Sequence, residues 1–151
     1  MNFADILKTK AAEVERPPLP PLGTYVWAVA RFELGEVSSD KGEWDTVEFH
    51  LQATEPSTGV DPDELAAYGN IANVKTRLSF MFDRHDEVKK AQTLYRLTTF
   101  LTEHLGIEAG KKDLNELINE SVGQACLGVL KYRTAPSGDQ FPEIGKTAPL
   151  E

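Results

Sequence analysis

The segment from Gly23 to Leu34, GTYVWAVARFEL, constrains the fold most strongly, because both rows of its alternating pattern contain large apolar residues. In a strand, successive side chains point to opposite faces of the sheet. We expect the wholly apolar row to face the core; its members are Val26, Ala28, Ala30, Phe32 and Leu34. The other row then presents Tyr25, Trp27 and Arg31 on the opposite face. Aromatic rings beside a cation are suited to stacked bases and phosphates.

Length and composition predict one compact domain. The chain has 151 residues, of which 40% are hydrophobic, enough for a core. Its apolar runs are far shorter than the roughly 18 to 20 residues of a membrane-spanning helix, and the N-terminus is amphipathic and unlike a signal peptide, so we expect a soluble intracellular protein. The one cysteine, Cys126, lies in a strand-like run and is expected to be buried and inert.

The net charge of -8 is concentrated in one region. Nine acidic residues and one basic residue, Lys41, fall between Glu36 and Glu64, whereas acids and bases balance in the remainder. This distribution is compatible with a basic groove elsewhere in the molecule. It also predicts weaker and more salt-sensitive binding of a polyanion than a cationic protein would show.

A short amphipathic helix and a proline-rich segment precede the first strand. The helix is indicated by apolar residues at helical spacing: Phe3, Ile6, Leu7, Ala11 and Val14. The segment from Arg16 to Gly23 contains four prolines, which favour an extended, stiff conformation. We interpret it as a lead-in to the strand, with a ligand for an SH3-like partner as the alternative. The sequence leaves open whether the Trp27 side chain faces solvent or lies beneath this proline-rich segment.

Alternation and helical spacing place the remaining elements. Strands are expected at 44–53, 74–82, 124–133 and 140–144, and helices at 61–69, 86–106 and 113–123. In the second and third strands the inward rows are Val47, Phe49, Leu51 and Ala53, and Val74, Thr76, Leu78, Phe80 and Phe82. The buried stripe of the long helix is expected to be Val88, Ala91, Leu94, Tyr95, Thr98, Leu101 and Leu105. Phe141 is expected to fill the interior of the barrel.

Three strands, a helical segment and two further strands form the element order of an OB-fold, a five-stranded Greek-key barrel that binds oligonucleotides. The predicted fold class is therefore mainly β with helices. The expected organisation is an N-terminal helix and proline-rich lead-in over residues 1–22, an OB-fold domain over 23–146, and a short tail over 147–151.

Three stretches resemble bacteriophage single-stranded DNA-binding proteins: PPLGTY at 20–25, SDKG at 39–42, and LINESVG at 117–123 leading into LGVLKYR at 127–133. The resemblance implies an OB-fold that coats single-stranded DNA without sequence specificity during phage replication or recombination, in the cytoplasm of the bacterial host. It also implies contacts with phage or host replication proteins. Many such proteins recruit partners through an acidic tail, but the last seven residues here, GKTAPLE, contain only one acidic side chain.

The candidate DNA contacts are aromatic and basic side chains on the predicted outer faces. Trp27 and Trp44, with Tyr25 or Tyr132, are candidates for stacking on bases. The candidate phosphate contacts are Arg31, Lys41, Lys75, Arg77, Lys131 and Arg133. Because neighbouring strand residues face opposite ways, Tyr132 is not expected to share a face with Lys131 and Arg133. The balance between DNA and RNA binding stays open.

No catalytic or metal-binding pattern accompanies these residues, so we expect neither an enzyme nor a cofactor. His50, His85 and His104 are dispersed, without a nucleophile motif or a phosphate-binding loop. The alternative function is an OB-like protein-interaction module, in which the aromatic face and the acidic region from Glu36 to Glu64 bind a protein. A small DNA-processing enzyme ranks below both.

Overall fold

The computed structural model describes residues 2–13 and 18–150, so Val14 of the predicted stripe, Arg16 and Pro17 of the lead-in, and Glu151 lie outside the described residues. The elements in chain order are α1 (Phe3–Leu7), η1 (Ala11–Glu13), β1 (Gly23–Ser39), β2 (Gly42–Pro56), α2 (Pro62–Tyr68), η2 (Ile71–Asn73), β3 (Lys75–Asp83), α3 (Glu87–Thr99), η3 (Phe100–His104), α4 (Leu114–Glu120), β4 (Ala125–Thr134) and β5 (Gln140–Ala148). In these ranges, no helix has the length and apolar character needed to cross a membrane.

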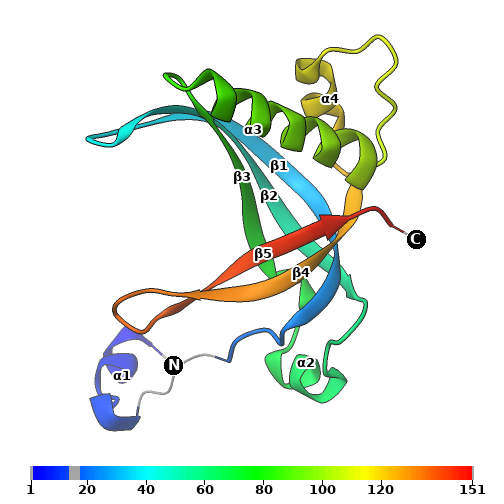
Figure 1. Ribbon diagram of the computed structural model, residues 1–151. Helices are drawn as coiled ribbons and strands as arrows, with labels where there is room; N and C mark the ends of the chain where they lie inside the picture. The colour runs from blue at the N-terminus through cyan, green and yellow to red at the C-terminus, as the bar shows by residue number, and fades with distance from the viewer. Residues whose placement is uncertain (1, 14–17, 151) are drawn as a thin grey trace.

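The five strands form one antiparallel sheet in the order β3-β2-β1-β4-β5. The sheet is strongly coiled, and α3 lies across one end of it (Figure 1). Its two edge strands, β3 and β5, approach one another: the Thr76 hydroxyl on β3 donates to the Pro142 carbonyl on β5 at 3.2 Å. The predicted class, mainly β with helices and an OB-like sheet, is confirmed. β5 extends to Ala148, four residues beyond the predicted end of the strand.

The core lies inside this coiled sheet and beneath α3. The inward row predicted for β2 is confirmed, since Val47, Phe49, Leu51 and Ala53 are all buried. Phe49, Phe80 and Phe100 form an aromatic cluster that joins the sheet to the helix, with ring centroids 5.1 to 5.9 Å apart. Such tilted and edge-on ring contacts stabilise a core beyond the area that they bury.

The facing predicted for the first half of β1 is wrong. Tyr25, Trp27 and Val29 point into the core and are at most 1% exposed. The reason is a β-bulge: Val29 pairs with Leu51 and Arg31 pairs with its neighbour His50, which leaves Ala30 as an extra residue. A bulge shifts the alternation by one residue. The row that begins inward at Tyr25 therefore continues inward at Phe32, and the Arg31 side chain points outward.

The proline-rich lead-in contacts the barrel at Tyr25 and Tyr132. Pro20 and Pro21 are buried, and the Tyr25 hydroxyl donates to the Pro21 carbonyl at 2.6 Å, while the Tyr132 hydroxyl donates to that of Pro20. Burial raises the pKa of Tyr132 to about 12. Trp27 is fully buried, so the alternative in which its side chain faces solvent is wrong.

Trp27 depends on a close approach to β4. Its indole Nε1 donates to the Gly128 carbonyl at 3.0 Å. A Cβ atom at position 128 would lie 2.8 Å from the Trp27 Cδ1 atom, closer than carbon atoms approach without displacement. The glycine therefore makes room for the ring and supplies its acceptor.

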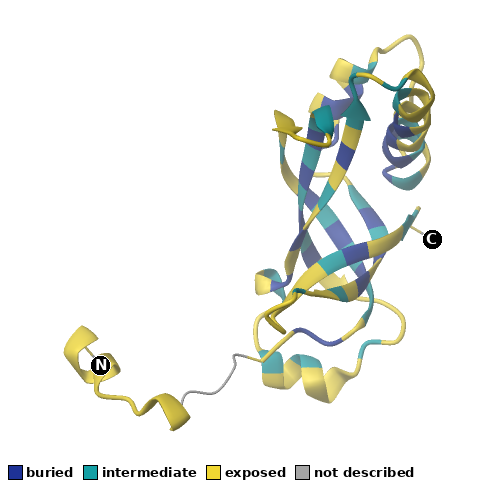
Figure 2. Cartoon of the chain, turned by 60° about the vertical axis from the view of Figure 1, so that its left-hand side comes forward, coloured by how far each residue is buried: buried dark blue, intermediate teal, exposed yellow. Residues whose placement is uncertain are grey.

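The buried stripe predicted for the long helix is also partly wrong. α3 and η3 bury Thr93, Leu97, Phe100 and Leu101, whereas Val88, Leu94 and Tyr95 are exposed. At about 100° per residue, Val88 and Leu97 lie about 180° apart, and the buried Thr93 and Leu97 do not belong to the predicted stripe, so the buried face of α3 is rotated away from that stripe. Figure 2 shows the exposed side of this helix turned away from the sheet.

Cys126 provides a test of the core. The side chain is fully buried, and burial raises the pKa of its thiol from the ordinary 9.0 to about 12. Because the thiolate is the reactive form, we expect negligible alkylation by iodoacetamide at mildly alkaline pH in the folded protein and rapid alkylation in guanidinium chloride. The raised pKa also means that this group's contribution to stability is lost as pH rises from about 9 towards 12. Equal alkylation rates in the two states, followed by mass spectrometry, would contradict the described packing.

Candidate nucleic-acid interface

The outer face of β1, β2 and β3 carries its polar side chains in rows that run across the strands. Arg31, His50 and Arg77 are direct neighbours in the pairing register and form a basic row. The adjacent row consists of Glu33, Glu48 and Ser79, and the row on the other side contains Ala28, Gln52 and Lys75. On β2 and β3 each row is two residues along the strand from the next, about 7 Å; on β1 the step from Ala28 to Arg31 is three residues, because it includes the bulge.

A surface depression of about 280 Å³ lies over these rows. Its lining residues are Ala30, Arg31, His50, Leu51, Gln52, Lys75, Thr76 and Arg77. Three predicted phosphate contacts, Arg31, Lys75 and Arg77, are therefore brought together from two strands that are not adjacent in the sheet. The bulge at Ala30 is essential, because without it Arg31 would follow Trp27 and Val29 into the core.

Sequence reasoning did not select His50 and Gln52 as site residues. Both lie on the polar row of β2, between the two strands that supply the cations. Their signal was the alternation of β2 itself: once Phe49, Leu51 and Ala53 face the core, His50 and Gln52 must face outward. The side chains are half-buried because their neighbours on β1 and β3 flank them.

The acidic row partly neutralises the basic row. Arg31 donates to Glu33, and Arg77 Nη1 lies 3.4 Å from Glu48 Oε1. Ser79 also donates to Glu48. The hydrogen bond and charge of Arg31 hold the pKa of Glu33 below its usual value, so this carboxylate is ionised at neutral pH. A polyanion that binds here must therefore compete with two protein carboxylates for the same guanidinium groups.

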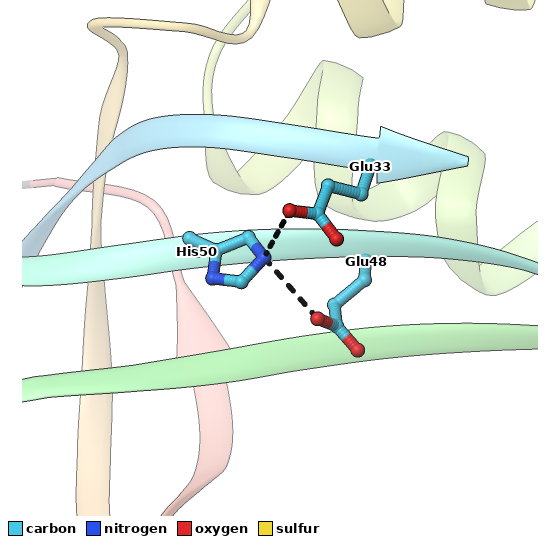
Figure 3. Close-up of side chains that lie close together, drawn as sticks. All are labelled: Glu33, Glu48 and His50. Carbon is cyan, nitrogen blue, oxygen red and sulfur yellow. Dashed lines mark ion pairs between the residues drawn. The ribbon is translucent and has the colours of Figure 1, made fainter. Parts of the chain in front are cut away.

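Glu33, Glu48 and His50 form the cluster in Figure 3, in which one ligand atom from each residue lies within 4.8 Å of the others. The His50 Nε2 atom is 3.6 Å from Glu33 Oε1 and 3.2 Å from Glu48 Oε1. Imidazole and carboxylate groups are ordinary zinc ligands. However, the same two carboxylate oxygens face the guanidinium groups of Arg31 and Arg77, which would repel a bound cation. The donor set fits an ion-pair network better than a metal centre.

The other predicted site residues lie outside this depression. Lys131 and Arg133 share the outer face of β4, and Tyr132 points inward to Pro20, as the alternation predicted. Phe141 does not fill the barrel: it is 46% exposed on β5, with the Arg133 guanidinium 5.6 Å from its ring centroid. Tyr25 and Trp27 have no exposed surface and are excluded as stacking residues.

Trp44 and Lys41 lie at the β1–β2 hairpin. Trp44 is half-buried on the outer side of β2, and its ring lies over Gly42, where an added Cβ would be 3.3 Å from the indole Cη2. Lys41 is exposed in the turn. The hairpin is tied to the end of β3 by Arg84, which pairs with three acids: Glu36 at 3.1 Å, Glu43 at 3.2 Å and Asp45 at 2.7 Å. These contacts raise the pKa of Arg84 further and lower that of Asp45.

The fold and this surface together define an OB-like domain with a basic depression on the outer face of its first three strands. No protein-family model matches the sequence, and no curated protein matches it.

Proposed function

We propose that this chain is a non-enzymatic single-stranded DNA-binding protein of bacteriophage type, which coats single strands in the cytoplasm of a bacterial host during replication or recombination. The observation that carries the proposal is the alignment of Arg31, Lys75 and Arg77 around one depression on an OB-like sheet. This surface suits a phosphate backbone, and OB-folds commonly bind oligonucleotides on the face formed by these strands.

Binding on this surface would be an exchange of ion pairs. Arg31 and Arg77 leave Glu33 and Glu48 and pair with phosphates, and the displaced carboxylates return to water. Stacking contributes less than the sequence predicted, because Tyr25 and Trp27 lie inside the barrel. The candidate rings are those of Trp44 and Phe141, with the imidazole of His50 in the depression itself. Affinity on such a surface depends strongly on salt.

The alternative function, a protein-interaction module, has less support. Its aromatic face consisted mainly of Tyr25 and Trp27, which are buried. Its acidic surface is partly neutralised within the chain, since Arg84 pairs with Glu36, Glu43 and Asp45. Contacts with replication proteins are compatible with either function.

The proposal is tested by fluorescence anisotropy with labelled oligo-dT, duplex DNA and single-stranded RNA at low and moderate salt. We expect oligo-dT to bind more tightly than duplex DNA, with an affinity that falls as salt rises. RNA binding measures the tolerance of the site for a 2′-hydroxyl. An absence of binding to every single strand at low salt would refute the proposed function.

Neutralising the acidic row should strengthen binding. In Glu48→Gln, Arg77 loses the carboxylate that competes with phosphate, and we expect oligo-dT to bind about two- to fivefold more tightly at low salt. Glu108→Gln, an exposed residue on the loop after α3, removes the same charge and should change affinity much less. Equal gains in the two variants would mean that only net charge matters, and weaker binding in Glu48→Gln would contradict the competition.

A further inference from the structure

The outer face of α3 is apolar and has no partner among the described residues. Val88 is 69% and Tyr95 is 75% exposed, whereas Thr93 and Leu97 on the opposite side bury against the sheet. A shallow depression runs along this exposed face, lined by Glu87, Val88, Ala91, Gln92, Tyr95 and Arg96. Isolated exposed apolar residues are common, but a contiguous apolar strip with charged ends is typical of an interaction surface.

The strip is symmetric about its own centre. The midpoint lies between Ala91 and Gln92. Val88 and Tyr95 lie at equal distances on either side of it, and the oppositely charged Glu87 and Arg96 lie at the two ends. A surface that carries an acid at one end and a base at the other is complementary to a second copy of itself turned by 180°. We propose that α3 packs antiparallel against α3 of a second copy of this chain and forms a symmetric dimer.

Helix-packing geometry supports this pairing. When two antiparallel helices cross at about 50°, the most frequent angle, rows of residues four apart interdigitate. On this face Glu87, Ala91 and Tyr95 form such a row. With the centre between Ala91 and Gln92, the crossing places Tyr95 of one copy over Val88 of the other, sets the small Ala91 side chains near the centre, and brings Glu87 of each copy beside Arg96 of the other. Two equivalent ion pairs then close the ends of the contact.

The N-terminal helix is the competing occupant of this face. α1 buries no residue, and its Phe3, Ile6 and Leu7 side chains are exposed. It does not explain why acid and base stand at equal distances from the centre of the α3 strip, which a second copy of α3 does. The dimer needs no DNA, so its test is independent of the proposed function.

Sedimentation velocity of the DNA-free protein over a range of concentrations tests the dimer. We expect a reversible monomer–dimer equilibrium, weak because one helix face buries a small area. Glu87→Arg and Arg96→Glu should each weaken dimerisation about tenfold or more, since each creates two like-charge contacts. Ala91→Arg should abolish it. All three sites are exposed, so the circular dichroism spectrum should match that of the parent. Urea midpoints should fall only slightly in the two charge variants, because Glu87 pairs with Lys90 and Arg96 donates to Thr93.

Exchanging the charges of residues 87 and 96 tests the proposed ion pairs directly. The double variant Glu87→Arg/Arg96→Glu should dimerise like the parent, and an equimolar mixture of the two single variants should form a heterodimer. The matched control, Glu108→Arg/Lys111→Glu on the loop after α3, should leave the equilibrium unchanged. A parent that stays monomeric at every concentration, a dimer insensitive to Ala91→Arg, or a dimer lost on deletion of residues 2–13 would overturn the proposal.

Discussion

Replacing Arg31, Lys75 and Arg77 together with alanine is expected to weaken oligo-dT binding about 100-fold at low salt, or about fivefold for each cation. The three side chains line one depression and belong to two strands, so they can contact successive phosphates of one strand of DNA. Each phosphate contact contributes about 0.7 to the slope of log affinity against log salt. The slope should therefore become shallower by about two in the triple variant.

A control variant with the same change in net charge separates the loss of these three phosphate contacts from the effect of the protein's overall charge. Lys89, Lys111 and Lys112 are exposed on α3 and the loop that follows it, away from the depression. Their triple alanine variant should lose much less affinity and keep the parental salt slope. Similar losses in the two triple variants would show that binding follows net charge and does not use the β1–β3 face.

Trp27→Ala is expected to lower the free energy of unfolding by about 3 to 5 kcal/mol, the usual cost of removing a large buried ring. The ring is fully buried, packs against Tyr25 at a centroid distance of 5.7 Å, and donates to Gly128. Its removal leaves a cavity and a buried carbonyl that has lost this donor. Urea unfolding followed by circular dichroism measures the change.

Trp44→Ala provides the comparison, because Trp44 is half-buried at the hairpin. We expect a loss of only about 1 kcal/mol in the free energy of unfolding. Its effect on oligo-dT affinity should exceed that of Trp27→Phe, which keeps the core filled. If Trp27→Ala were as stable as the parent and bound DNA poorly, the ring would have to lie on the surface, contrary to the structure.

The order of the elements could be predicted from the sequence because each strand and helix has its own periodicity. The inward rows of β2 and β3 follow strict alternation, and both were predicted correctly. The facing of β1 could not be predicted, because the bulge at Ala30 depends on pairing with β2 and because both sequence rows contain large apolar residues. The same irregularity buries Trp27 and exposes Arg31. On α3, Thr93 lies in the core, where its hydroxyl donates to the Met81 carbonyl, and hydrophobicity alone does not select such a residue.

Part of the candidate site was also accessible from the sequence. Lys75 and Arg77 alternate with buried residues on β3, so their shared outward face follows from the pattern alone. The strand register that places Arg31, His50 and Arg77 in one row could not be predicted from the pattern, because it pairs residues that are far apart along the chain. The competition by Glu33 and Glu48 follows from the same register and has no sequence signal of its own.

Backbone amide chemical shifts during titration with oligo-dT test the central claim most directly, because they locate the binding surface residue by residue. We predict that the largest changes fall on the outer face of β1, β2 and β3, at Arg31, His50, Gln52, Lys75 and Arg77, with smaller changes near Trp44 and Phe141. The exposed face of α3 should change little. Changes confined to α3 or α4, with none on these strands, would contradict the account.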